Sequence, residues 1–525
     1  MGGAALEPAG GSAFQIKMKD GRMVMKYVFL AIFVFIMIAI GIISKRKVKN
    51  VQDFFLGGRQ MGPWLTAFAY GTTYFSAVIF IGYAGKIGWG FGISSTFIGI
   101  GNAIIGSLLA WLVLAKRTRK MTHELNVSTM PEFFEKRYGS RAMKIVTAII
   151  IFIFLVPYSA SVYQGLGYLF ERTFGIPFVY CMAAMALLTG VYLLLGGYVA
   201  TALNDFVQGI IMLAGVGFMI YFILSNPAVG GLGNGLKKLS EIPGDGPGLV
   251  SIFSDKPMNL LGLILLTSLG TWGLPQMVHK FYAIKDDAAI KRGTIISTVF
   301  ALIVGGGAYF AGSFGRLFLD NTMPMGANGK PNADMVMPMV LEKALPEALT
   351  GIIVLLVLSA SMSTLSSLVL VSSSAISLDL IKGTFFPEIK KEKVMLLMRV
   401  LCVIFVVLSF LVAVTPNSIL SLMSFSWGTV AGAFLAPFLY GLYWKGTTKA
   451  GAWSGFITGF SVSVAGAIIY KMDAGMAPNI GAAAMLLSLI TVPVVSLISS
   501  KISQKQSGKV PSDVGNSCRE VGAKL

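Results

Sequence analysis

Long apolar segments recur along the chain and are separated by short polar connections. Most of them reach roughly 18 residues or more, the length that an α-helix needs to cross the hydrocarbon core of a bilayer. The short alternating segments of a transmembrane β-barrel are absent from the sequence. The pattern predicts an all-α membrane protein with about 13 transmembrane helices. We expect these spans at roughly residues 27–44, 64–85, 92–115, 143–170, 176–196, 200–224, 258–283, 294–316, 347–378, 395–413, 418–444, 451–470 and 480–499.

Two of the predicted spans carry small, polar and helix-breaking residues where an apolar helix is otherwise expected. The first is the stretch GTTYFSAVIFIG at residues 71–82, and the second is SLGTWGLPQ at residues 268–276, which contains Pro275. In hydrocarbon, every backbone N–H and C=O group needs a partner, so an interrupted helix is tolerated only where its freed groups face protein or a cavity. Close packing of two helices through small residues is the alternative explanation for either stretch alone.

The two interruptions occupy corresponding places in two sets of five spans, at about residues 64–224 and 258–444. Paired broken helices of this kind are typical of secondary transporters built from inverted repeats, which bind their substrate near the middle of the membrane. The sequence therefore predicts a carrier with a five-plus-five inverted-repeat core, in which freed helix N-termini favour an anionic group of the solute.

A third stretch, LSASMSTLSSLVLVSSSAISLDL at residues 358–380, adds a polar stripe to the ninth predicted span. Ser359, Ser363 and Ser366 or Ser367 recur at helical spacing, and Ala360 lies one turn before Ser363 and Thr364. Neutral hydroxyls and freed carbonyls suit a monovalent cation better than a divalent one, which needs carboxylates. Sodium is the candidate ion, although a single hydroxyl could instead bond back to its own helix.

One acidic residue, Asp205 in TALNDFVQG, lies well inside a predicted span. Acidic side chains inside a membrane are costly and usually functional. Asp205 lies between one and two turns from a cytoplasmic helix end, where it could attract and release a cation on the inner path. A structural pairing with a nearby Lys or Arg is the other interpretation.

Composition and charge support a membrane protein and set its orientation. Hydrophobic residues make up 55% of the chain and charged residues only 12%, and the formal net charge is +19. Lys and Arg gather in the loops at residues 45–59 and 116–141, and such short basic loops remain in the cytoplasm. With thirteen spans, the N-terminus is expected outside and the C-terminus in the cytoplasm, in the cell inner (plasma) membrane. Retention of these loops explains the charge, so nucleic acid is not an expected partner.

The ends of the chain are polar, and the sequence contains no recognisable catalytic motif. We expect a flexible N-terminal segment at residues 1–26, a transmembrane domain at 27–500 and a cytoplasmic tail at 501–525. No Walker loop, Gly-x-Ser-x-Gly elbow or His-Glu-x-x-His motif is present, so the chain is not expected to be an enzyme. Three cysteines and two histidines have no spacing that suggests a metal cluster.

Several motifs in order resemble the sodium:solute symporter family over about residues 27–500. They are DFFLGGRQMGPW, TAFAYGTTYFSAVIFIG, MPEFFEKRYG, LLLGGYVATALNDFVQG, MSTLSSLVLVSSSAISLDL and APFLYGLYW. The resemblance implies an amino-acid-transporter-like fold that couples solute uptake to inward sodium movement by alternating access. It also implies a sodium site formed by the carbonyls of Thr72, Phe75 and Ala360 and the hydroxyls of Ser363 and Thr364. Asp205 would lie on the inner sodium route.

Differences from family members narrow the expected solute. The Glu-Gln pair of the sugar carriers is replaced here by Val78, Ile79 and Phe80, an apolar wall that argues against a sugar. Bacterial proline carriers have Asp where this chain has Tyr74, and their aromatic substrate residues align with Thr267 and Thr271, whereas the following Pro275 is kept. The elements TTYFSAV, GLPQ and LNDFVQGIIMLAG lean towards the pantothenate carriers, and short monocarboxylate carriers share some features.

The resulting prediction is a sodium-coupled importer of a small carboxylate-bearing solute: pantothenate, a monocarboxylate or an amino acid such as proline. A sodium/sugar symporter, a channel and a transporter-like sensor are the alternatives. The expected partners are the solute, sodium and the lipid bilayer, and the expected functional unit is a monomer. The predicted substrate-binding residues are Thr73, Tyr74, Ser76, Tyr163, Thr271, Trp272 and Pro275.

Overall fold

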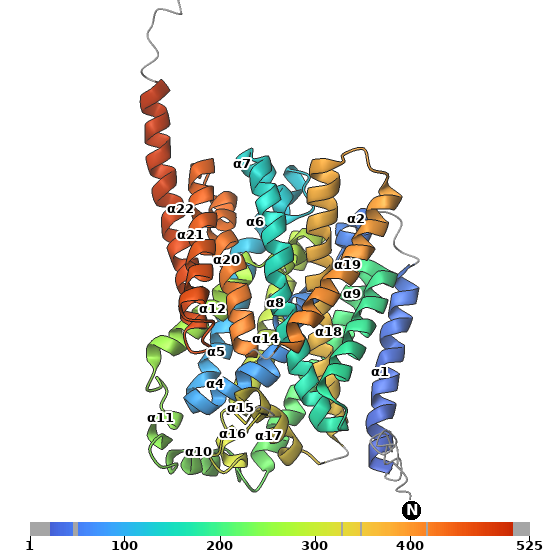
Figure 1. The fold of residues 1–525 in the computed structure, drawn as a ribbon, viewed down its shortest axis with the longest axis vertical. Coiled ribbons are helices and arrows are strands. Elements are labelled where there is room, and N and C mark those ends of the chain that lie inside the picture. Colours follow the sequence, from blue (N-terminus) through green and yellow to red (C-terminus); the bar gives the residue numbers. More distant parts are fainter. Residues whose placement is uncertain (1–20, 46–50, 327–328, 347–348, 416–417, 508–525) are drawn as a thin grey trace, which may run out of the picture.

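The computed structural model describes residues 21–45, 51–326, 329–346, 349–415 and 418–507, which form a bundle of helices (Figure 1). One end of the bundle carries α6 and α7, and the other end carries the short helices α10, α11, α16 and α17 (Figure 1). The long helices α1 and α22 lie at opposite sides of the bundle. The expected flexible segment at 1–26 and tail at 501–525 fall largely outside the described residues.

The first half of the chain contributes the following helices and short π-helical segments. They are α1 (Gly21–Lys45), α2 (Val51–Leu56), α3 (Pro63–Tyr74), η2 (Val78–Tyr83), α4 (Ala84–Phe91), α5 (Thr96–Gly101), η4 (Asn102–Leu109), η5 (Trp111–Ala115), α6 (Lys116–Glu124), α7 (Met130–Tyr138), α8 (Arg141–Phe174), α9 (Phe178–Ser225), α10 (Leu232–Ser240) and α11 (Gly246–Val250).

The second half contributes a matching series. It consists of α12 (Pro257–Gly273), α13 (Pro275–Ala283), α14 (Asp287–Ala301), η6 (Leu302–Gly306), α15 (Gly307–Gly312), α16 (Gly315–Phe318), α17 (Val336–Ala344), α18 (Thr350–Ser374), η9 (Ala375–Phe385), α19 (Lys391–Val414), α20 (Ile419–Tyr443), α21 (Lys449–Ile469) and α22 (Ala477–Ser507).

Ten helices of the described residues are long and apolar enough to cross a membrane, or eleven if the bent pair α12 and α13 counts as one span. The number thirteen stays a prediction, and two segments account for the difference. The expected span at 64–85 is divided at Phe75, so α3 has only 12 residues and the second part joins the next helix. The expected span at 176–196 gives only the shorter apolar stretch Phe178–Leu188, and α9 departs from helical geometry at Gly197.

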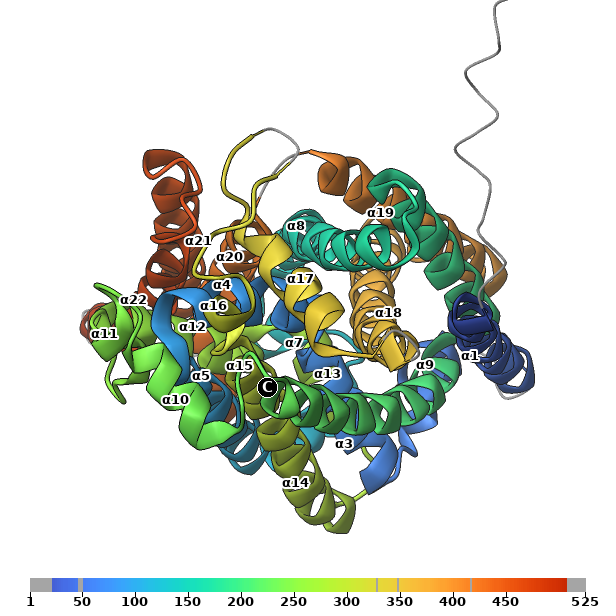
Figure 2. The same cartoon turned by 90° about the horizontal axis from the view of Figure 1, so that it is seen from below.

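The centre of the bundle is formed by α18 and α20. Buried positions make up 89% of the most apolar window of α18 and 94% of that of α20, against 22% in α1 and 28% in α21. Figure 2 shows α18 beside α8 and α9, which both pack against it. The serine-rich stretch predicted as an ion site therefore lies on the most enclosed part of the fold, where unpaired polar groups are costly.

Three arginines at the α7 end bind backbone carbonyls at the ends of other helices. Arg119 donates to Ile284 and Lys285 just beyond α13, at 3.2 and 2.6 Å. Arg137 donates to the carbonyls of Gly441 and Trp444 at the end of α20, and Arg141 donates to that of Thr384 in η9. A guanidinium suits this place because the last carbonyls of a helix have no intrahelical partner and carry partial negative charge.

Close contact between α9 and α18 requires a small residue at position 215. A Cβ atom at Gly215 would lie 2.8 Å from the Cβ atom of Leu356 in α18, whereas a Cβ atom at Gly217 of the same helix would meet nothing within 4 Å. We expect Gly215→Leu to destabilise the purified protein by about 1–3 kcal/mol through overpacking. Thermal unfolding in detergent measures this loss, with Gly217→Leu as the matched control. Equal melting temperatures for the two variants would contradict the contact.

Candidate functional site

The first predicted helix interruption is present in the structure. Helix α3 ends at Tyr74, Phe75 adopts an extended conformation at φ −106° and ψ 107°, and helix resumes at Val78. Ser76 closes the gap, since its side-chain oxygen accepts from the N–H of Val78 at 3.2 Å and its carbonyl accepts from Ile79 at 3.1 Å. The interruption expected from the run of Gly, Thr, Tyr and Ser is therefore confirmed.

The second interruption is also confirmed. Helix α12 ends at Gly273, Leu274 is extended at φ −79° and ψ 122°, and α13 begins at Pro275 with a bend of 45°. Proline suits the first position of a helix because its missing N–H would have no partner there. One hydrogen bond joins the two broken segments directly, from the Tyr74 hydroxyl to the carbonyl of Thr267 at 2.7 Å.

A small pocket lies at the first break, and we refer to it as the central pocket. Its lining residues come from both broken segments and from η4, α15 and α20: Tyr74, Phe75, Ser76, Val78, Ile79, Tyr83, Asn102, Thr267, Tyr309, Met423 and Trp427. Its cavity volume is only about 10 Å³, which is space for about one water molecule. A solute must therefore displace some of these side chains in order to bind.

Aromatic rings form one wall of the central pocket. Tyr74 stacks on Phe75 at 4.4 Å between ring centroids and lies 6.2 Å from Trp427, which in turn meets Tyr158 edge to face at 5.6 Å. Apolar rings bury a large area, while the few polar groups beside them set orientation. The charged side chains of the described residues are absent from this lining, so only uncharged groups would contact a solute there.

The predicted substrate residues divide into those that line the central pocket and those that do not. Tyr74 and Ser76 line it. Thr271 and Trp272 instead donate to the carbonyls of Gly106 and Ile105 in η4, at 3.0 and 2.9 Å. Tyr163 is buried within α8, outside this lining. Their role in binding a solute stays a prediction.

Thr73 and Pro275, the two remaining predicted substrate residues, face other neighbours. The Thr73 hydroxyl lies 3.0 Å from that of Ser367 in α18. Pro275, which follows the second break, lines a second pocket together with His279 and Asp379. Neither residue is among those that line the central pocket.

Four of the five predicted sodium ligands converge where α3 meets α18. The Thr364 hydroxyl lies 3.1 Å from the carbonyl oxygen of Ala360, 3.3 Å from that of Thr72 and 3.2 Å from that of Thr73. Ser363 donates to the Thr72 hydroxyl at 2.7 Å. All of these side chains are buried. The spacing of the stripe and the break in α3 thus bring the expected oxygens together.

This cluster contains more acceptor oxygens than protons. Thr364 has one hydroxyl proton, yet three carbonyl oxygens lie within hydrogen-bonding distance of its oxygen. The Ala360 carbonyl also accepts within α18, whereas those of Thr72 and Thr73 lie at the end of α3, where a monovalent cation would supply the partner that helix breaking removes. The donor set of neutral oxygens therefore fits sodium.

Phe75 and Gly71 have packing roles in this structure. The backbone N–H of Phe75 donates to the carbonyl of Gly71, and its ring faces Tyr74 and Phe300. A Cβ atom at Gly71 would lie 2.4 Å from the ring of Phe300 in α14. The small residue at position 71 is therefore required for the approach of α14, which helix packing in membranes commonly achieves through glycine.

Asp205 forms a buried ion pair with a lysine that the sequence analysis did not name. Its carboxylate lies 3.6 Å from the ammonium of Lys280 in α13, and the two side chains are 1% and 2% exposed. Lys280 also donates to the Ser367 hydroxyl at 3.0 Å and lies over the ring of Tyr198 at 5.4 Å. The structural pairing considered for Asp205 is thus present, and it reaches the serine stripe of α18.

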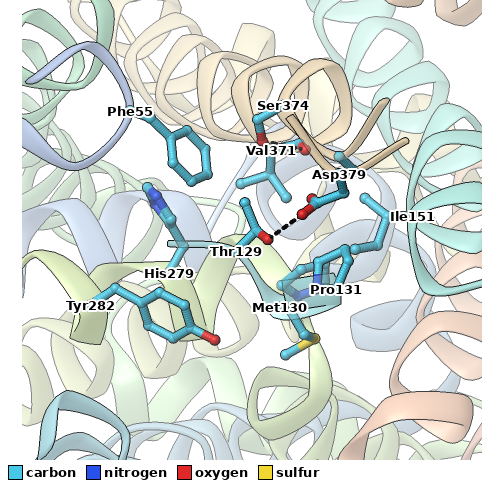
Figure 3. A pocket seen from close by; sticks show the side chains of 12 residues that line it. Phe55, Thr129, Met130, Pro131, Ile151, His279, Tyr282, Val371, Ser374 and Asp379 are labelled. Atoms are coloured by element: carbon cyan, nitrogen blue, oxygen red, sulfur yellow. Dashed lines mark hydrogen bonds between the residues drawn. The ribbon is translucent and has the colours of Figure 1, made fainter. Parts of the chain in front are cut away.

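The second pocket contains a further buried acid, Asp379 of η9, and Figure 3 shows its lining. Asp379 accepts a hydrogen bond from Thr129 at 2.7 Å (Figure 3). His279, Tyr282 and Ser374 line the same pocket, whose cavity volume is about 10 Å³. The described conformation therefore has little free space on either side of the second break.

Sequence reasoning missed Lys280 and Trp427. Lys280 lies in α13 shortly after the break at Leu274, so a basic residue inside the predicted span 258–283 was the available signal. Trp427 lies in an apolar helix with no sequence feature that marks it, and only the folded structure brings it to the central pocket.

The Tyr74 hydroxyl joins the two broken segments, and its removal has a testable effect. We expect Tyr74→Phe to lower the initial rate of sodium-dependent uptake about two- to tenfold, because a neutral hydrogen bond contributes about 0.5–1.5 kcal/mol. Tyr440→Phe is the matched control, since that hydroxyl donates to the carbonyl of Leu489 at 3.0 Å away from the pocket. Equal uptake by the two variants would show that the bond between the segments is dispensable.

Two interrupted helices around a small pocket, beside a cluster of neutral oxygens suited to a monovalent cation, define a secondary transporter. The family model described as "Sodium:solute symporter family" matches residues 54–459. This chain belongs to the sodium:solute symporter family. It is a sodium-coupled solute symporter rather than an enzyme, and a multi-pass protein of the plasma membrane.

Curated relatives match nearly the whole chain. The osmoregulated proline transporter of Bacillus subtilis (strain 168) is 29% identical over 480 residues, covering 91% of this chain and 94% of its own length. The sodium/proline symporter of Escherichia coli (strain K12) is 30% identical over 443 residues, covering 82% of this chain and 86% of its own. The sequence resemblance to the family is therefore confirmed.

A solved structure confirms the fold class. A Na+-coupled sialic acid symporter in a substrate-bound outward-open state superposes with a TM-score of 0.73 at 17% sequence identity, covering 90% of this chain and 97% of that one. A nucleobase-cation-symport-1 family transporter in a closed conformation gives 0.50 at 14% identity and covers 85% of this chain and 95% of its own. The all-helical transporter fold expected from the sequence is thus the observed fold.

Proposed function

We propose that this protein imports proline, or an amino acid of similar size, together with sodium by alternating access. The observation that carries the proposal is the central pocket, which combines an aromatic wall with the backbone of an interrupted helix. The compact apolar ring of proline would pack against the aromatic rings of Tyr74 and Trp427. The helix that restarts at Val78 points the positive end of its dipole at the break, which favours a carboxylate.

The polar groups of the central pocket suit the amine of an amino acid. Asn102 accepts from the Thr267 hydroxyl at 2.8 Å and from Ser268 at 3.1 Å through one side-chain oxygen. The same face carries the Thr267 carbonyl, which accepts from Tyr74. An amine would replace the donors that these oxygens have here, while the helix N-terminus at Val78 favours the carboxylate of a zwitterion. The relatives named as proline transporters add support.

The proposed sodium site consists of Thr72, Phe75, Ala360, Ser363 and Thr364, as the sequence motifs imply. The convergence of four of these residues and their excess of acceptor oxygens support the assignment. Thr73 joins this cluster through its carbonyl and directly precedes Tyr74 of the central pocket. One short segment would thus sense both the ion and the solute, which is a physical basis for their coupling.

Uptake into proteoliposomes tests the proposal. Purified protein under an inward sodium gradient is expected to accumulate radiolabelled proline above the external concentration, and to lose this uptake when choline replaces sodium. Pantothenate, lactate and glucose are the comparison solutes. Accumulation of one of them instead would reject proline while leaving symport in place. Sodium flux that ignores every solute would favour a channel.

The remaining expectations about arrangement belong to the same proposal. We infer inverted repeats at about 64–224 and 258–444, an outside N-terminus, a cytoplasmic C-terminus and a monomeric functional unit in the lipid bilayer. The basic loops at 45–59 and 116–141 support this orientation. Cysteine accessibility in intact cells, at exposed Lys237 of α10 and at exposed Lys120 of α6, tests it.

A further inference from the structure

Lys280 is a buried charged residue beside the proposed sodium site, and the proposed function gives it no role. Its ammonium is buried and held by three groups: the Asp205 carboxylate at 3.6 Å, the Ser367 hydroxyl at 3.0 Å and the face of Tyr198 at 5.4 Å. A buried ion pair is weak evidence for stability, because the cost of removing two charges from water can exceed their attraction. An ionisable pair within a membrane protein therefore calls for a functional explanation.

The groups around the Lys280 ammonium are those of a cation site. Asp205 offers a full negative charge, and neither of its carboxylate oxygens accepts a hydrogen bond from any described residue. Ser367 offers a hydroxyl on the same helix as Ser363, one turn further on. A carboxylate with free oxygen lone pairs and a neighbouring hydroxyl would bind a sodium ion if the ammonium were absent.

This second cluster is joined to the proposed sodium site by one residue. The Thr73 hydroxyl lies 3.0 Å from that of Ser367, and the Thr73 carbonyl lies 3.2 Å from the Thr364 hydroxyl. The charge beside Asp205 therefore acts on the sodium site at short range and in a buried environment, where screening by solvent is weak.

We propose that the Lys280 ammonium is a built-in cation, held between Asp205 and Ser367 in the place where a second sodium ion would otherwise bind. This inference rests on the proposed sodium-coupled function. It assigns one sodium ion to each transport cycle, bound at the proposed site of Thr72, Phe75, Ala360, Ser363 and Thr364. Asp205 then neutralises the fixed charge and does not serve as a station on the sodium route.

Direct counting of bound sodium tests the inference without reference to the solute. Scintillation-proximity binding of ²²Na+ to purified wild-type protein is expected to saturate at one ion per chain. Lys280→Met frees the Asp205 carboxylate and is expected to bind two ions per chain. Lys280→Arg keeps the cation, and Lys280→Met combined with Asp205→Asn removes both charges, so each of these controls is expected to bind one.

Each result decides between distinct conclusions. Two ions bound to the wild-type protein, or one ion bound to folded Lys280→Met, would overturn the inference while symport stands. No sodium binding to the wild-type protein would instead reject the proposed function. If Lys280→Met is unstable, its melting temperature is compared in sodium and in choline. Stabilisation by sodium beyond that of the wild type supports a new site, and equal instability in both salts overturns it.

Discussion

Replacing Ser363 and Thr364 together by alanine is expected to raise the half-saturating sodium concentration for uptake about 100-fold or more. The two hydroxyls lie against Thr72, and the Thr364 oxygen also contacts the carbonyls of Thr73 and Ala360. Each hydrogen bond or ligand contact to a charged group contributes about 1.5–3 kcal/mol. Loss of two such contacts exceeds the 2.7 kcal/mol or so that corresponds to a 100-fold change in affinity.

Sodium titration of proline uptake measures this change, and sodium-dependent thermal stabilisation measures it independently of the solute. Ser361→Ala is the matched control, because Ser361 lies on the same helix and donates to its own helix carbonyl at Val357. Thr364→Ser should retain most of the affinity, since the hydroxyl remains. An unchanged sodium requirement in the double variant would remove these residues from the ion site.

Neutralising Asp205 alone is expected to produce the largest loss of stability. In Asp205→Asn, the buried Lys280 ammonium keeps its charge and loses its counter-ion, a change that costs about 3–5 kcal/mol. Adding Lys280→Met to the same protein removes the unpaired charge and should recover most of that loss. Chemical or thermal unfolding of the two single variants and the double variant gives the coupling between the residues.

The exposed ion pair between Arg172 and Glu342 provides the control for this measurement. Its side chains are 43% and 51% exposed, although the nitrogen and oxygen atoms are only 2.6 Å apart. Glu342→Gln should therefore cost less than about 1 kcal/mol, because solvent screens such a pair. Equal stability of Asp205→Asn and the wild type would show that Lys280 finds another partner. The Asp205–Lys280 pair would then not be needed for stability.

The two helix interruptions could be predicted because they rest on local chemistry. Pro275 cannot continue a helix without losing a hydrogen bond, and the residues at 71–76 free backbone groups that only a protein interior can satisfy. The serine stripe followed in the same way from helical periodicity. That the break in α3 lies against Thr364 of α18 was implied only by the resemblance to the family, and the structure has this contact.

Features that depend on long-range packing could not be read from the sequence. The ion pair joins residues 205 and 280, and nothing in either local pattern indicates which acid a buried lysine will meet. Gly197 adopts φ 56° inside an apolar run, so its departure from the helix carries no distinct hydrophobic signal. Trp272 likewise lies just before the break at Leu274, yet its indole donates to the carbonyl of Ile105 in η4.

The arginine contacts at the α7 end give one segment two separate tasks. Arg119, Arg137 and Arg141 belong to the basic loop on which the proposed orientation rests, and the same side chains donate to carbonyls at the ends of α13, η9 and α20. Lysine carries equal charge but lacks the planar fork that reaches two carbonyls at once. Lysine at these positions would thus keep the positive charge of the loop but lose the paired contacts that Arg119 and Arg137 make with the ends of α13 and α20.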